Sequence, residues 1–225
     1  MQMKTMYLCA ALATGAATAS LLAQVPVQKE PHHKQLIYTA HMRVFDVNVP
    51  AGRSTEDHTH EYDMITVAIG DSTSRSRSGG QTGDPAVRPS GHLALAEHTG
   101  KPSAHILENT GQAPLRLIAV ENVRDAGWTK PTPLQAPATS LAQESRSFGV
   151  YEVRLNDATK QTAHRHEVPT VVVLVSGSYV FQGDGGSEPF RVDDIGRWVY
   201  SPPNNQHTLS VPAGSEARLI EFEAR

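Results

Sequence analysis

Two short histidine motifs constrain the fold of this chain more than any other feature. Each has the pattern His-x-His-Glu, and the copies begin at His58 and His164. Residues i and i+2 of a β-strand point to the same face, so each motif presents two imidazole side chains side by side. A third histidine follows each motif, His105 after the first and His207 after the second. Three imidazole nitrogens suit a divalent transition metal, so the pattern predicts a metal site in each copy.

The same order of features occurs twice, which indicates two copies of one domain of roughly 100 residues. The motifs begin 106 positions apart, and the downstream histidines lie 102 positions apart. The tripeptide Arg-Leu-Ile at 116–118 recurs at 218–220, and each occurrence soon reaches an acid, Glu121 or Glu221. An apolar run with β-branched residues follows each histidine motif.

The charge and the residue pattern of the chain limit which functions and fold classes are expected. The net charge of −3 and the scattered basic residues provide no electrostatic footprint for nucleic acid. Short candidate strands are separated by turns rich in glycine and proline, and no segment has sustained helical periodicity. This pattern predicts an all-β sandwich or barrel.

The N-terminal 23 residues are typical of a secretory signal peptide. One lysine precedes an apolar, alanine-rich stretch, with small residues for cleavage after Ala19 or Ala23. A membrane anchor is the alternative, but the stretch contains Thr, Gly and Ser and is short for a span. We therefore expect a periplasmic or secreted protein without a membrane span after cleavage. The single cysteine, Cys9, would be lost with the signal, which leaves no disulfide.

The rest of the chain is expected to divide into a tail, two domains and a linker. The tail is polar, and its His32 and His33 are expected to be flexible surface residues. The linker contains three prolines and many small polar residues. The four segments are the tail 24–35, the first domain 36–121, the linker 122–146 and the second domain 147–225.

The motifs resemble those of the cupin superfamily, and in particular a bicupin. In the first cupin motif, a glycine precedes His-x-His by five residues and a second glycine closes the motif, as Gly52 and Gly70 do here. In the second motif, a glycine precedes a proline turn and a histidine, as Gly196 precedes Pro202 and His207. The resemblance implies two tandem double-stranded β-helix (jelly-roll) barrels with a metal ion inside each.

The chain departs from the cupin pattern at the expected fourth ligand. The pattern places a carboxylate three or four residues beyond the His-x-His motif, where the two copies have Met64-Ile65 and Thr170-Val171. Asp63 is one residue short of that place and is a possible additional ligand. The sequence therefore favours three-histidine sites with open positions for water or substrate.

Three further residues are candidates for contacts with the ligand histidines. Glu61 and Glu167 follow the motifs directly, and strand parity points them away from the imidazoles. They either orient a ligand histidine or face solvent. His98 shares an expected strand face with His92, which lies either inside the barrel or on the surface.

These observations predict a metalloprotein that acts on a small organic molecule. The predicted ion is a divalent transition metal (Fe, Mn, Zn, Ni or Cu), whose identity three histidines do not decide. Among enzymes, dioxygenase-type chemistry is favoured over isomerase or lyase chemistry. A non-catalytic metal or small-ligand binding protein is the alternative, and the oligomeric state is open. The predicted metal ligands are His58, His60, His105, His164, His166 and His207.

Overall fold

The computed structural model describes residues 24–124, 130–159, 161–184 and 188–225. Apart from one 3-10 helix, η1 (Val27–Lys29), the secondary structure of these residues consists of β-strands, which confirms the predicted all-β class. The predicted signal peptide lies outside the described residues. In the part of the chain that is described, no helix is long and apolar enough to cross a membrane.

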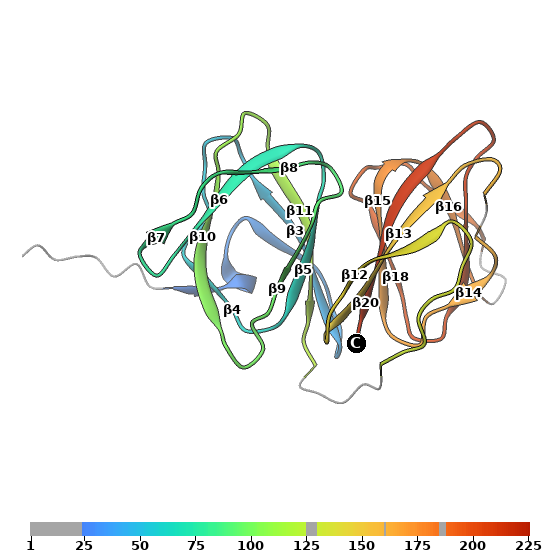
Figure 1. Cartoon of the computed structure of the whole chain (residues 1–225), viewed down its shortest axis with the longest axis horizontal. Helices are drawn as coiled ribbons and strands as arrows, with labels where there is room; N and C mark the ends of the chain where they lie inside the picture. The colour runs from blue at the N-terminus through green and yellow to red at the C-terminus, as the bar shows by residue number, and fades with distance from the viewer. Residues whose placement is uncertain (1–23, 125–129, 160, 185–187) are drawn as a thin grey trace, which may run out of the picture.

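The N-terminal half consists of two sheets (Figure 1). One sheet has the order β1-β4-β10-β6-β7, with β8 paired to β6, and the other has the order β2-β3-β11-β5-β9. The strands are β1 (Val25–Pro26), β2 (His33–Tyr38), β3 (Met42–Val49), β4 (His58–His60), β5 (Met64–Ala68), β6 (Ser72–Ser78), β7 (Gln81–Thr82), β8 (Ala86–Arg88), β9 (Leu93–Ala96), β10 (Ser103–Asn109) and β11 (Leu115–Asn122).

The C-terminal half repeats this plan with a five-stranded and a four-stranded sheet, ordered β12-β13-β20-β15-β18 and β14-β19-β16-β17. In the described residues, no sheet contains strands from both halves. The strands are β12 (Thr139–Glu144), β13 (Phe148–Leu155), β14 (His164–Arg165), β15 (Thr170–Gly177), β16 (Tyr179–Gly183), β17 (Phe190–Val192), β18 (Trp198–Ser201), β19 (Gln206–Ser210) and β20 (Ala217–Ala224).

Two segments differ from their sequence-based expectations. The expected polar tail, 24–35, contains β1, η1 and the start of β2, and its Glu30 and His33 are buried. The expected linker, 122–146, contains β12, which is an edge strand of the C-terminal five-stranded sheet. Most side chains of β12 are exposed or half-buried, which suits the polar composition of this edge strand.

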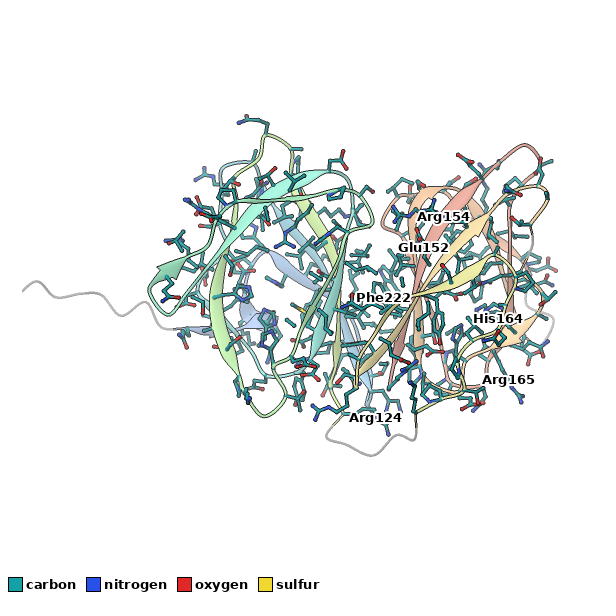
Figure 2. The ribbon with its side chains drawn as sticks, in the orientation of Figure 1. Arg124, Glu152, Arg154, His164, Arg165 and Phe222 are labelled. Atoms are coloured by element: carbon teal, nitrogen blue, oxygen red, sulfur yellow. The ribbon has the colours of Figure 1, made fainter. Side chains whose placement is uncertain are left out.

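The hydrophobic core has three layers. One lies within the N-terminal half and includes Phe45, Val47 and Leu117; a second lies within the C-terminal half. The third lies between the halves, and Figure 2 shows Phe222 in it. Alternate residues of a strand face opposite sides, so β3 packs Phe45 inward and Val44 toward the other half. The continuous apolar runs of the sequence are therefore strands buried on both faces.

Two arginines at equivalent repeat positions connect the halves reciprocally. Arg116 pairs with Asp46 of its own half and donates from Nη1 to the carbonyl oxygen of Ile195, 2.9 Å away. Arg218 pairs with Glu152 and donates from Nη1 to the carbonyl oxygen of Ser90, also at 2.9 Å. The two halves are thus related by a pseudo-two-fold arrangement of the same contacts.

Candidate metal centres

Strand pairing brings each downstream histidine next to its motif. In the N-terminal half, β10 pairs with β4 so that His105 lies opposite His58. In the C-terminal half, β19 pairs with β14 so that His207 lies opposite His164. The sequence could not indicate this register directly, because the paired strands are more than 40 residues apart.

The first cluster consists of His33, His58, His60 and His105. Candidate ligand nitrogens of His33, His58 and His60 lie within 4.8 Å of one another. The His105 ring borders this group, with its centroid 4.6 Å from that of His58 and 5.1 Å from that of His60. His33 enters from β2, and its ring centroid is 4.5 Å from that of His58.

In three of these histidines, Nδ1 is held by an oxygen atom. The His33 Nδ1 lies 2.5 Å from the Glu30 carboxylate, and the His58 Nδ1 lies 2.9 Å from the carbonyl oxygen of Glu56. The His60 Nδ1 lies 3.3 Å from Oε1 of Glu121. An oxygen partner on Nδ1 fixes the ring orientation and leaves Nε2 as the atom that is free to bind a metal.

The second cluster consists of His164, His166, His207 and Glu221, whose candidate ligand atoms all lie within 4.8 Å of one another. Oε1 of Glu221 is 3.7 Å from Nε2 of His164 and 3.8 Å from Nε2 of His207, and Oε2 is 3.8 Å from Nε2 of His166. Four ligands at about 2.1 Å from one ion would be separated by about 3.4 Å. The second cluster is therefore close to the spacing of a ligand shell.

The Nδ1 atoms of the second cluster are held in the same way. That of His164 lies 3.0 Å from the carbonyl oxygen of Thr162, and that of His166 lies 2.8 Å from Oε1 of Glu223. The His207 Nδ1 has two longer contacts, at 3.4 Å, with Ser201 and the carbonyl oxygen of Asn205.

The hydrogen bonding of the nitrogen and oxygen atoms that point into each cluster indicates whether a metal ion would fit there. A buried polar atom without a partner is costly, so a group of such atoms at one point indicates a ligand. Among the described residues, the buried atoms without a hydrogen-bond partner include Nε2 of His58, His60, His164, His166 and His207 and both carboxylate oxygens of Glu221. These imidazole nitrogens and carboxylate oxygens are of types that bind metals, so the residues present fit a divalent transition metal.

Burial sets the protonation state of the first cluster. It lowers the pKa of His58 to about 4, that of His60 to about 2 and that of His105 to about 3, with mutual repulsion among the histidines as a further cause. Metal ligation requires a neutral imidazole. These side chains are therefore in their ligating form at neutral pH.

The second cluster has a different electrostatic balance because it contains a carboxylate. Burial alone would raise the pKa of Glu221, but His164 and His207 hold it well below its usual range. Burial lowers the pKa of His164, but Glu221 outweighs this effect and the pKa is raised. The pKa of His207 is lowered, mainly by burial.

The structure adds two residues to the groups predicted from the sequence. His33 was expected in a flexible tail, and only the pairing of β2 with β3 brings it to His58. Glu221 was recognised as an acid of the repeat but was not assigned to the site. The flanking apolar residues Ile220 and Phe222 were a usable signal, because a carboxylate buried among such residues requires a partner.

Three sequence-based candidates lie outside the clusters. Asp63 accepts hydrogen bonds from the backbone N–H groups of His98 and Thr99 and from the hydroxyl group of Ser147, so it is not one of the grouped ligands. Its carboxylate instead fixes the loop after β9 and connects it to the C-terminal half. Glu61 and Glu167 are exposed, as strand parity predicted. Arg165, between two motif histidines, also points outward (Figure 2).

His98 lies beside the first cluster. It is buried, its ring stacks on that of His60 at a centroid distance of 5.2 Å, and its Nδ1 lies 2.9 Å from the Ser103 hydroxyl. Its Nε2 is buried and has no hydrogen-bond partner among the described residues. His92, expected on the same face, is exposed; it precedes β9 and His98 follows it, so the two histidines do not share one strand.

The chain was compared with known proteins. No family model and no curated protein sequence matches it. Solved structures do match. A cupin 2 conserved barrel domain protein from Leptotrichia buccalis is 9% identical, with 86% of this chain and 88% of that chain covered and a TM-score of 0.59.

Two enzyme structures also match. Salicylate 1,2-dioxygenase from Pseudaminobacter salicylatoxidans is 14% identical, with 88% of this chain and 78% of that chain covered and a TM-score of 0.67. Oxalate decarboxylase from Bacillus subtilis, which has Mn(II) centres, is 10% identical, with 83% and 69% covered and a TM-score of 0.60. At these identities the likeness shows the fold, and we conclude that this chain has the all-β fold of cupin proteins.

Proposed function

We propose that the protein is an exported bicupin, with two jelly-roll domains that each bind a divalent transition metal. The duplicated sheet plan and the two equivalent histidine clusters support this proposal. The observation that carries it is the convergence of partnerless, buried Nε2 atoms at one point in each half. A divalent metal there would supply a Lewis acid with further positions for a small substrate or dioxygen.

The chain's own residues would perform two tasks around such a metal. The oxygen partners on Nδ1 hold each ring in one tautomer and direct Nε2 inward. The surrounding apolar residues exclude water, which strengthens electrostatic interactions with a bound substrate.

We propose catalysis rather than passive binding, with dioxygenase-type oxidation before isomerase or lyase chemistry. Support comes from buried ionisable groups inside each half that are suited to hold or transfer a proton. Burial raises the pKa of Glu121 to about 7, although Arg43 acts to lower it. Burial also raises the pKa of Tyr179, whose hydroxyl group has no hydrogen-bond partner among the described residues. The similar structures include a dioxygenase and a decarboxylase.

The first test is metal content, measured by elemental analysis of the protein purified without a histidine tag. We expect about two equivalents per chain. His58→Ala/His60→Ala and His164→Ala/His166→Ala should each remove one equivalent. Failure of the intact chain to bind Fe, Mn, Ni, Cu or Zn would contradict the proposal.

The second test separates catalysis from binding. Dioxygen uptake and carbon dioxide release would be measured with salicylate, oxalate and related small acids after loading with Fe or Mn. We expect turnover of at least one acid that both double variants reduce. Tight binding of these acids without turnover would instead support the non-catalytic alternative.

The proposed export has its own test. We expect the mature protein, recovered from the periplasm or the medium, to begin after Ala19 or Ala23, as N-terminal sequencing would show. An uncleaved chain that stays with the cells would contradict this part of the proposal.

A further inference from the structure

The two clusters take their fourth member from different strands. The repeats can be superposed through strand register, because β3 and β13 are equivalent strands 106 positions apart. His33 pairs with Val47 of β3, and Thr139 pairs with Val153 of β13. Thr139 therefore occupies, in the C-terminal half, the position that His33 occupies in the N-terminal half.

The same register identifies the counterpart of Glu221. Glu221 pairs with Tyr151 of β13, and Ala119 pairs with Phe45 of β3. Ala119 therefore occupies the position of Glu221, and its methyl group is packed in the core of the N-terminal half. At the two positions, the N-terminal half has His33 and Ala119, and the C-terminal half has Thr139 and Glu221. Each half therefore has one strong metal-ligating side chain, but at a different position.

This exchange changes the chemistry of the clusters. The first cluster presents imidazole nitrogens only, whereas the second presents three imidazoles and one carboxylate. Imidazole ligands suit Zn, Cu and Ni, and carboxylate oxygens add affinity for harder ions such as Mn. A carboxylate also offsets one of the two positive charges of the ion, which four neutral imidazoles do not.

The geometry of the second cluster shows that the carboxylate is inside the ligand group. Glu221 is fully buried, and its oxygens lie 3.7 to 3.8 Å from three separate Nε2 atoms. Glu121 of the first cluster differs, because one of its oxygens lies 3.3 Å from the Nδ1 atom of His60 and the other lies 3.0 Å from Nε of Arg43. It approaches the outer side of the His60 ring.

We infer that the two clusters are metal sites of different selectivity. Compared with the first cluster, which contains His33, the second cluster, which contains Glu221, has a selectivity shifted from Zn(II) toward Mn(II). The inference rests on the proposed function, since it assumes that both clusters bind a metal. It attributes the difference in selectivity to the fourth ligand, which is His33 from β2 in the first cluster and Glu221 from β20 in the second.

The test uses two full-length single-site variants. His164→Ala/His166→Ala leaves the first cluster, and His58→Ala/His60→Ala leaves the second. The dissociation constant for Mn(II) is measured by electron paramagnetic resonance and that for Zn(II) by competition with a chromophoric chelator. We expect the Mn-to-Zn ratio of dissociation constants to be larger at the first cluster by about tenfold or more.

Exchange variants assign the difference to the named residues. In the second-cluster background, Glu221→Gln keeps the side-chain shape and should weaken Mn(II) binding more than Zn(II) binding. Thr139→His/Glu221→Ala should move the ratio toward that of the first cluster. Circular dichroism and thermal unfolding identify any variant that fails to fold, and the isosteric Glu221→Gln variant guards against that outcome.

The outcomes separate the two proposals. Equal ratios at the two clusters, or a Glu221→Gln variant that weakens both metals equally, would overturn the selectivity inference and leave the metal sites in place. Absence of binding of either metal to both single-site variants and to the intact chain would overturn the proposed function as well.

Discussion

Glu121 and Glu223 are equivalent residues of the two repeats, and each lies against Nδ1 of the second histidine of its motif. The contact is 3.3 Å for Glu121 and 2.8 Å for Glu223. Each glutamate also contacts an arginine, Arg43 or Arg225. A carboxylate held in this way orients the imidazole and raises its basicity as a ligand. Residues outside the ligand group therefore influence how tightly it binds metal.

The first prediction concerns Glu223. Replacing it with glutamine removes the charge that faces the His166 Nδ1, so the affinity of the second cluster for metal should fall about 10- to 100-fold. A chelator competition assay on the His58→Ala/His60→Ala background would measure this change. Glu167→Gln is the matched control, because Glu167 follows the same histidine but is exposed. A similar loss in both variants would contradict the prediction.

The second prediction concerns pH. Burial lowers the pKa of His58 to about 4 and that of His105 to about 3, whereas an unfolded histidine titrates near pH 6.5. Below about pH 6.5 the unfolded chain therefore binds more protons than the folded, metal-free chain, and the free energy of unfolding falls as pH falls toward 4. Glu121, whose pKa is raised to about 7, and His164, whose pKa is also raised, oppose this effect. They are outnumbered by the buried histidines whose pKa is lowered, which are His58, His60, His98, His105 and His207.

Urea unfolding of the metal-free protein at about pH 7 and about pH 5 would measure this effect. We expect a lower midpoint at the lower pH. The double variant His58→Gln/His105→Gln should lose less stability between the two pH values, because two of the buried imidazoles are gone. A midpoint that does not change with pH in the intact chain would contradict the assignment.

Among the strands, β15 shows how a single backbone position sets the end of an element. Gly177 closes β15 with φ of +79°, and a Cβ atom there would lie 1.9 Å from the carbonyl oxygen of Glu216 on the chain entering β20. The close approach lets β15 and β20 pair along their length, with Gly177 opposite Ala217. This pairing holds Glu221 in register with the histidines.

The third prediction uses this position. Gly177→Ala should destabilise the protein by about 3 kcal/mol, because both backbone strain and a steric clash must be relieved. Gly214→Ala is the control: its φ is +75° but a Cβ would meet nothing within 4 Å, so it should cost only about 1 kcal/mol. Chemical unfolding compares the two, and equal costs would show that the contact with Glu216 is unimportant.

In the whole molecule, the two five-stranded sheets pack against each other through an apolar layer that belongs to both halves. Phe222 is fully buried in this layer, and Arg116 and Arg218 connect its rim. A large shared hydrophobic layer couples the stability of the halves. We therefore expect the intact chain to unfold as one cooperative unit.

The fourth prediction tests this coupling. Phe222→Ala should lower the free energy of unfolding by about 3 to 5 kcal/mol, since it leaves a cavity between the sheets. Calorimetry of this variant should resolve separate transitions of the two halves. Phe190→Ala is the control, because Phe190 is 47% exposed and its loss should have little effect. A single transition in both variants would mean that the coupling does not depend on this layer.

Local periodicity and duplication in the sequence were sufficient to predict the all-β class, the two repeats and the pairs of motif histidines. These features follow from strand geometry, in which i and i+2 share a face regardless of what surrounds the strand. The same rule pointed Glu61 and Glu167 away from the imidazoles, and of the two alternatives left open for them the structure has both residues exposed.

The fourth member of each cluster depended on the tertiary structure. His33 lies in a polar segment without a local signal, and it reaches His58 only because β2 adds to the edge of a sheet next to β3. Glu221 and Ala119 occupy equivalent positions, yet only one is a ligand-type residue, so the repeat itself could not identify the position. Ligand groups combine residues from several strands, and register between distant strands is a property of the folded chain rather than of any one segment.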